Sequence, residues 1–137
     1  MFIYLPFTAD ILTPGHIKTI ELARTHGFVV IGLLTDAALR GNRKTLVPYE
    51  DRLFIMEYIA KAIGNTMVVP QIRLDPTENI KFYECTTIAS GKEFSPEEQD
   101  AIKSLKLDTL EIRLKGERKG AKNKTYSSAK IKEKLAQ

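Results

Sequence analysis

The apolar run Phe28–Leu34 constrains the fold of this chain more than any other segment. A strand with one solvated face alternates apolar and polar residues, whereas this run contains no polar side chain. Such runs are typical of central strands in a parallel sheet that is covered by helices on both faces. Because parallel neighbours are joined by crossover connections, the run predicts helices before and after it.

The rest of the chain alternates between short apolar runs and segments with helical periodicity. Strands are expected at residues 2–7, 28–34, 66–70, 85–89 and 110–114, and helices at 14–26, 49–63, 76–82, from Ser95-Pro96 onward, and at 127–135. Ser95, Pro96 and Glu98 form the strongest helix start, with a cap, a proline in the first turn and a capping box. We therefore expect one α/β domain over residues 1–137, with a Rossmann-like, mainly parallel sheet of about five strands flanked by helices.

Composition narrows the class of protein. A single cysteine, Cys85, excludes an intrachain disulfide and favours a reducing, cytoplasmic location. With two histidines beside it, Cys85 does not make a convincing zinc site. The N-terminal apolar run is too short for a signal peptide, and no stretch approaches the length that crosses a bilayer. The net charge of +4 favours anionic ligands without identifying one.

Residues 115–124 form a basic, glycine-containing tract. A tract of this kind is typical of a solvated loop, and it could also serve a nucleic acid or a polyphosphate. Nucleic-acid binding is the weaker alternative, because only Tyr126, at the end of the tract, could stack on a base.

Residues 8–16, Thr-Ala-Asp-Ile-Leu-Thr-Pro-Gly-His, join the first strand to the first helix. A helix N-terminus has unpaired N–H groups and a partial positive charge, so this place suits a triphosphate. Gly15 lets a ligand approach the backbone closely, and His16 can donate a hydrogen bond to a transferring phosphoryl group. The same residues also fit an ordinary helix start, with Thr13 as the cap, Pro14 in the first turn and His16 on the surface.

Four segments follow one another in an order that resembles a known family. They are residues 8–17, 32–36 (Gly-Leu-Leu-Thr-Asp), 48–52 (Pro-Tyr-Glu-Asp-Arg) and 126–131 (Tyr-Ser-Ser-Ala-Lys-Ile). Together they resemble the cytidylyltransferase-like branch of the HxGH nucleotidyltransferase superfamily. The nearest resemblance is to phosphonate cytidylyltransferase domains, often fused to phosphoenolpyruvate mutase, and then to glycerol-3-phosphate cytidylyltransferases.

This resemblance implies transfer of CMP from CTP to a small phosphate or phosphonate acceptor, with release of pyrophosphate. The acceptor oxygen would attack the α-phosphorus in line, so the protein's work is positioning and charge stabilisation. The resemblance also implies Mg²⁺ on the triphosphate, with no metal ligands assigned to this chain, and a homodimer.

Site residues are carried over position by position. Catalysis is assigned to His16, Arg52 and Lys44, although Arg43 is an alternative to Lys44. Acceptor binding is assigned to Asp36 and to Arg52, which is expected to hold phosphate through its planar fork; the alternative is an ordinary surface arginine. Nucleotide binding is assigned to Thr8, Ala9, Asp10, Thr13, Gly15, His16, Gly91, Lys122, Ser127 and Ser128. The simpler alternatives are that Asp10 braces its loop and that Ser127 only caps the last helix.

Two departures from the family pattern keep other functions open. Thr13 stands in place of the first histidine of the motif. Some adenylyltransferases of the superfamily also have threonine at this position, so the resemblance indicates CTP less specifically. Residues 90–94, Ser-Gly-Lys-Glu-Phe, stand in place of a Gly-Asp-Asp-Trp segment, with Lys92 in place of an aspartate. The alternatives are therefore an ATP-dependent adenylyltransferase and a catalytically weak nucleotide-binding subunit of the same fold.

Overall fold

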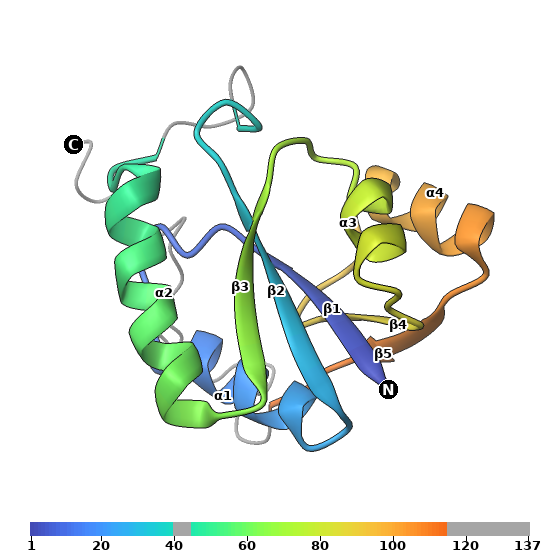
Figure 1. Ribbon diagram of the computed structural model, residues 1–137, viewed down its shortest axis with the longest axis horizontal. Helices are drawn as coiled ribbons and strands as arrows, with labels where there is room; N and C mark the ends of the chain where they lie inside the picture. Colours follow the sequence, from blue (N-terminus) through green and yellow to red (C-terminus); the bar gives the residue numbers. More distant parts are fainter. Residues whose placement is uncertain (40–44, 115–137) are drawn as a thin grey trace, which may run out of the picture.

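The described residues form a sheet of five parallel strands in the order β3-β2-β1-β4-β5 (Figure 1). The computed structural model describes residues 1–39 and 45–114. The strands are β1 (Phe2–Phe7), β2 (Phe28–Leu34), β3 (Thr66–Gln71), β4 (Thr87–Ser90) and β5 (Asp108–Glu111). The predicted α/β class and parallel sheet are thus confirmed, and the apolar run that predicted them is β2, next to the centre.

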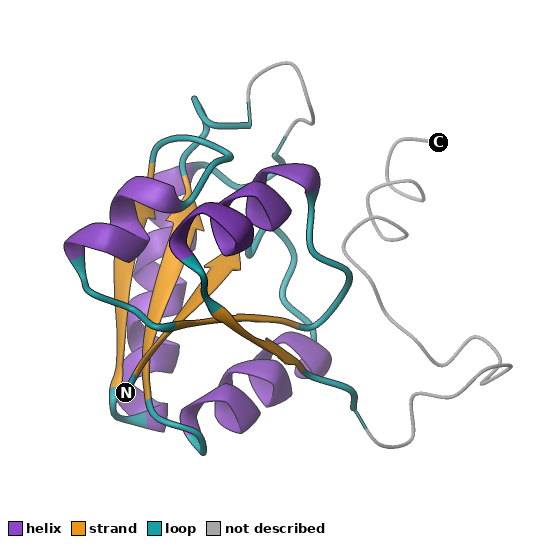
Figure 2. Cartoon of the chain, turned by 90° about the vertical axis from the view of Figure 1, so that its right-hand side faces the viewer, coloured by secondary structure: helices purple, strands orange, loops and turns teal. Residues whose placement is uncertain are grey.

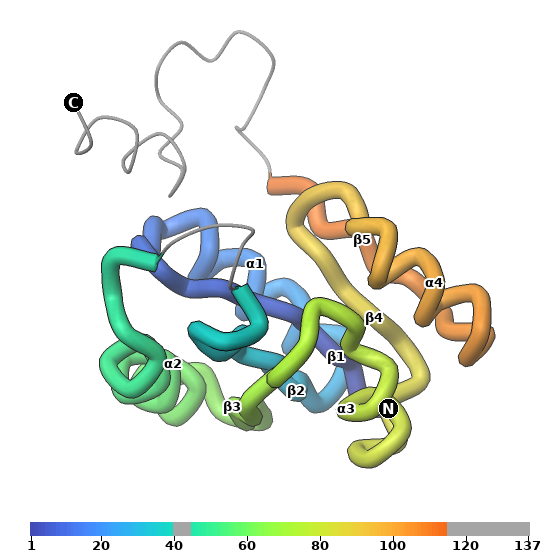
Figure 3. The backbone as a smooth tube through the Cα atoms, turned by 90° about the horizontal axis from the view of Figure 1, so that it is seen from above, coloured from blue at the N-terminus to red at the C-terminus, as the bar shows by residue number. Residues whose placement is uncertain are grey.

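Two described helices cover each face of the sheet (Figures 2 and 3). They are α1 (Pro14–Arg24) and α2 (Tyr49–Ile63) on one face, and α3 (Thr77–Phe82) and α4 (Pro96–Leu105) on the other. Ile3 and Leu5 of β1 pack in the core under α1 and α2, whereas Tyr4 between them packs toward α3 and α4. None of the described helices is both long and apolar enough to span a membrane.

Most predicted bounds agree with the structure to within two residues, and the last strand is the main exception. It was expected at residues 110–114 but covers Asp108–Glu111, because its partner β4 is short and Ser90 pairs with Glu111. The capping box predicted before α4 is present, with Ser95 N–H donating to Glu98 at 3.0 Å and Glu98 N–H donating to Ser95 at 3.2 Å. The helix expected at residues 127–135 lies outside the described residues.

A buried polar network joins β1 to β3 on the α3 side. The Tyr4 hydroxyl donates to Gln71 Oε1 at 2.7 Å and accepts from Asn79 Nδ2 at 2.9 Å. The phenol lies directly over Gly32 of β2, where an added Cβ would be 1.8 Å from the Tyr4 oxygen. Burial raises the pKa of Tyr4 well above its usual value. This network requires a glycine in the middle of an otherwise apolar central strand.

The strand order changes direction at β1. The chain runs from β1 through β2 to β3 on one side, and β4 and β5 follow on the other. In open parallel sheets, ligands bind beyond the carboxyl ends of the strands where the order reverses. Here that place lies between the loop that follows β1 and the loop that follows β4.

Candidate functional site

The first turn of α1 orients the His16 ring. The Thr13 N–H donates to His16 Nδ1 at 3.0 Å, while the His16 N–H donates to the Thr13 carbonyl at 3.0 Å. Because a backbone N–H can only donate, Nδ1 has to accept, and the proton of the neutral ring is on Nε2. The expected helix start at Thr13 is confirmed, and His16 is a member of its capping box rather than a free surface histidine.

The His16 ring is held neutral with its Nε2–H available. Burial first, and then the positive charge of Lys92, lowers the pKa of His16 below the usual 6.5. A proton on Nδ1 would also break the hydrogen bond from the Thr13 N–H, and this loss further lowers the pKa of His16. Phe7, the last residue of β1, packs edge-on against the ring with 5.6 Å between centroids. Among the described residues, every buried polar side-chain atom has a hydrogen-bond partner. His16 Nε2 has no partner among those residues, so it is not buried, and its N–H reaches solvent.

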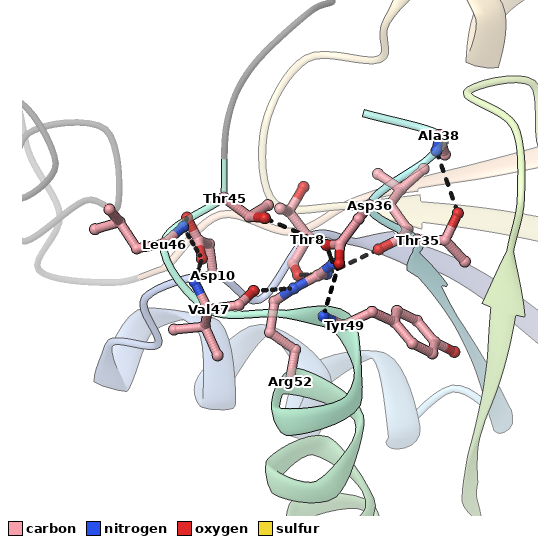
Figure 4. A network of polar contacts seen from close by, with 11 residues as sticks. Thr8, Asp10, Thr35, Asp36, Ala38, Thr45, Leu46, Val47, Tyr49 and Arg52 are labelled. Atoms are coloured by element: carbon pink, nitrogen blue, oxygen red, sulfur yellow. Dashed lines mark hydrogen bonds and ion pairs between the residues drawn. The ribbon is translucent and has the colours of Figure 1, made fainter. Parts of the chain in front are cut away.

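Asp10 ties the loop after β1 to the segment that precedes α2 (Figure 4). Its carboxylate accepts from the Leu46 N–H at 3.0 Å and from the Val47 N–H at 2.9 Å. Asp10 is buried, and Ala9 before it has a φ of 56°, in the left-handed region that costs a non-glycine residue about 1 kcal/mol. The bracing role considered for Asp10 is therefore the one its contacts support.

Arg52 lies inside the protein, which corrects both positions expected for it. The side chain is 0% exposed, and its guanidinium is surrounded by protein acceptors (Figure 4). Nη1 donates to the carbonyls of Thr8 at 2.7 Å and Leu34 at 2.8 Å, and Nε donates to the carbonyl of Val47 at 2.9 Å. Arg52 is thus neither a surface arginine nor placed to touch a phosphate. It joins the carboxyl ends of β1 and β2 to the start of α2.

Asp36 completes this network at the surface. Its carboxylate accepts from Arg52 Nη2 at 2.7 Å, from the Tyr49 N–H at 3.1 Å and from the Thr45 hydroxyl at 3.2 Å. The Tyr49 N–H first, and then the Arg52 hydrogen bond, lowers the pKa of Asp36. Because its side chain is 52% exposed, Asp36 is the member of this network that a ligand at the carboxyl edge can reach.

The loop that follows β4 packs on the same turn of α1. A Cβ at Gly91 would lie 3.1 Å from Thr19 Oγ1, and that hydroxyl donates to the Gly15 carbonyl at 2.9 Å. The Lys92 N–H donates to Ser90 Oγ at 3.1 Å, which turns the chain as it leaves the strand. Gly91 is therefore closely packed against α1, and the charge of the next residue, Lys92, acts on His16. In the sequence, Lys92 is a departure from the family pattern, and its position directly after the fourth strand is the signal that places it at this edge of the sheet.

The structure brings together Thr8, Ala9, Asp10, Thr13, Gly15, His16, Asp36, Arg52 and Gly91 at one edge of the sheet. The other predicted residues, Arg43, Lys44, Lys122, Ser127 and Ser128, lie outside the described part of the chain. Within residues 1–39 and 45–114, no group of three histidine, cysteine or acidic side chains is placed to hold a metal ion.

Comparison with known proteins agrees with this geometry. The cytidylyltransferase-like family model matches residues 5–134. The chain belongs to the cytidylyltransferase-like family. A search of curated proteins found no significant match. The family match includes all the site residues above, and it supports a nucleotidyltransferase activity in general.

Two solved structures share the cytidylyltransferase-like fold of this chain. A lipopolysaccharide core biosynthesis protein from Thermoplasma volcanium GSS1 is 18% identical, with a TM-score of 0.65 over 83% of this chain and 95% of the other. A protein of unknown function from Archaeoglobus fulgidus is 16% identical, with a TM-score of 0.62 over 87% of this chain and 94% of the other. At these identities the likeness is one of fold.

Proposed function

We propose that this protein transfers CMP from CTP to a small phosphate or phosphonate acceptor and releases pyrophosphate. The observation that carries the proposal is His16, a neutral imidazole whose Nε2–H reaches solvent at the N-terminus of α1, where the strand order reverses. The choice of CTP and of the acceptor class rests on the Thr-Ala-Asp opening and the Gly-Leu-Leu-Thr-Asp strand end, which resemble phosphonate cytidylyltransferases.

In the proposed reaction, an oxygen of the acceptor attacks the α-phosphorus of CTP, a P–O bond forms, and the bond to the pyrophosphate leaving group breaks. His16 Nε2–H donates to a phosphate oxygen on which negative charge accumulates. The free N–H groups at the start of α1 add further donors, and Gly15 keeps the approach open. Mg²⁺, when carried by the triphosphate, neutralises part of its charge.

Arg52 and Asp10 contribute to this reaction as positioning residues. Arg52 fixes the carbonyl of Thr8, and Asp10 anchors the loop that leads to Thr13. A donor that is already oriented needs no reorganisation when charge develops, which is the main electrostatic advantage of an enzyme site over water. The rigid loop therefore supports the placement of His16 against the α- or β-phosphate.

The test is pyrophosphate release from CTP with Mg²⁺ and a panel of phosphonates and phosphorylated alcohols. We expect turnover by the wild-type protein and a loss of about 100-fold or more in His16→Ala, the usual cost of removing a transition-state donor. His26→Ala is the matched control, because His26 is exposed at the far end of α1. Equal turnover in the wild type and His16→Ala would refute the site.

The same assay separates the alternatives. Preference for ATP over CTP would favour an adenylyltransferase, to which Thr13 points. Nucleotide binding without turnover on a broad panel would favour a catalytically weak nucleotide-binding subunit. The homodimer stays a prediction, to be checked by the mass of the protein in solution.

A further inference from the structure

A triphosphate site needs positive charge, and the described residues expected to supply it do not. Arg52 is buried and bonded to protein acceptors. Thr13 is uncharged, and His16 accepts at Nδ1 and so stands as a neutral ring. A donor without charge orients a phosphate oxygen but leaves most of the negative charge uncompensated. Arg43, Lys44 and Lys122, the other cations assigned to the site, lie outside the described residues. Among the described residues, a different cation would therefore have to compensate the phosphate charge on this side of His16.

Lys92 is a cation at the same edge of the sheet as His16. It is exposed and follows β4, the strand that flanks β1 on the far side of the switch point. Gly91 holds this loop against Thr19, whose hydroxyl bonds to the Gly15 carbonyl one residue before His16. The Lys92 N–H donates to the Ser90 hydroxyl at 3.1 Å, and this hydrogen bond fixes the backbone from which the Lys92 side chain extends. The effect of the Lys92 charge on His16 agrees with this geometry.

We propose that Lys92 binds a phosphate oxygen of the nucleotide across the crevice from His16 and supplies the charge that the neutral imidazole does not. The inference rests on the proposed function and adds to it a residue that approaches from the other side of the sheet. In this proposal the two side chains have different roles. The His16 imidazole donates a hydrogen bond in a fixed direction, and the Lys92 ammonium supplies a compact positive charge on a flexible stem. A phosphate group between them is held from β1 and from β4 together.

Binding of inorganic pyrophosphate and of CTP, each with Mg²⁺, measured by isothermal titration calorimetry, tests this role. In Lys92→Gln we expect the Kd of both ligands to rise about tenfold or more, as for the loss of one hydrogen bond to a charged group. Lys92→Arg should stay within about threefold of the wild type, because the charge is kept. Lys103→Gln is the matched control, since it removes the same charge from an exposed position in the last turn of α4.

A second readout distinguishes a local charge from a folding effect. The pH titration of the His16 ring, followed by NMR, should move upward in Lys92→Gln and stay in place in Lys103→Gln. If CTP binds and His16→Ala weakens it while Lys92→Gln does not, the role of Lys92 is refuted and the proposed function stands. If neither pyrophosphate nor any nucleotide binds the wild-type protein, the proposed function fails as well.

Discussion

Replacing Arg52 by methionine tests whether this arginine supports the fold or binds phosphate. The substitution keeps an unbranched stem and removes every guanidinium donor. Three backbone carbonyls, those of Thr8, Leu34 and Val47, then lose their partner, at about 1 kcal/mol each. The bond to Asp36 adds less, because that carboxylate is 52% exposed and water can replace the arginine.

The expected loss is therefore about 3–4 kcal/mol, a large part of the roughly 5–15 kcal/mol by which a domain is stable. Urea unfolding followed by circular dichroism measures it, with a fall in Tm of roughly 10–20 °C in a thermal scan. Arg73→Met is the control, because Arg73 is exposed and its ion pair at 3.7 Å is with an equally exposed Glu78. The free energy of unfolding of this variant should fall by less than about 0.5 kcal/mol. A change below 1 kcal/mol in Arg52→Met, accompanied by weaker pyrophosphate binding, would refute the bracing role and restore the phosphate contact.

Three further predictions follow from the geometry. The His16 ring should titrate below pH 6.5, which NMR measures. Because protonation is disfavoured only in the folded state, the neutral His16 ring contributes fully to the free energy of unfolding above pH 6.5, and this contribution is lost as the pH falls through the folded pKa; urea unfolding at several pH values measures the loss. Gly15→Ala should leave the free energy of unfolding within about 0.5 kcal/mol, because its Cβ would meet nothing closer than 3.5 Å, yet weaken CTP binding if a phosphate approaches that backbone. Gly32→Ala should destabilise by about 3 kcal/mol or more, since its Cβ would displace the Tyr4 phenol from Gln71; unchanged urea unfolding would contradict this packing.

The fold could be predicted because its signals are local. Uninterrupted apolar runs, such as Phe28–Leu34, fix which segments are buried on two faces, and the Ser95-Pro96 start fixes where α4 begins. The end of the last strand could not be predicted in the same way. Leu110, Ile112 and Leu114 do alternate toward one core cluster, but pairing ends where β4 ends, and that depends on a partner some twenty residues away.

The candidate site was predicted less completely, because it depends on contacts between distant segments. The position of Arg52 had a signal in the sequence: it lies four and eight residues before Met56 and Ala60, on the buried face of α2. An arginine on that face is buried with its partners, and here the partners are mostly backbone carbonyls, which no sequence pattern shows. The approach of Lys92 to His16 likewise arises only when β4 pairs beside β1.

The position of β1 at the centre of the sheet has a consequence for synthesis. Of the five described strands, β1 leaves the ribosome first, and β2 and β3 complete one side of it by Gln71. Its other edge pairs with β4, which begins only at Thr87. At a synthesis rate of about 5–20 residues per second, that edge stays unpaired for about 1–3 s after β3 is complete. Fragments that end between these two strands would keep the edge open permanently, so the second half of the chain protects the first from strand-to-strand association.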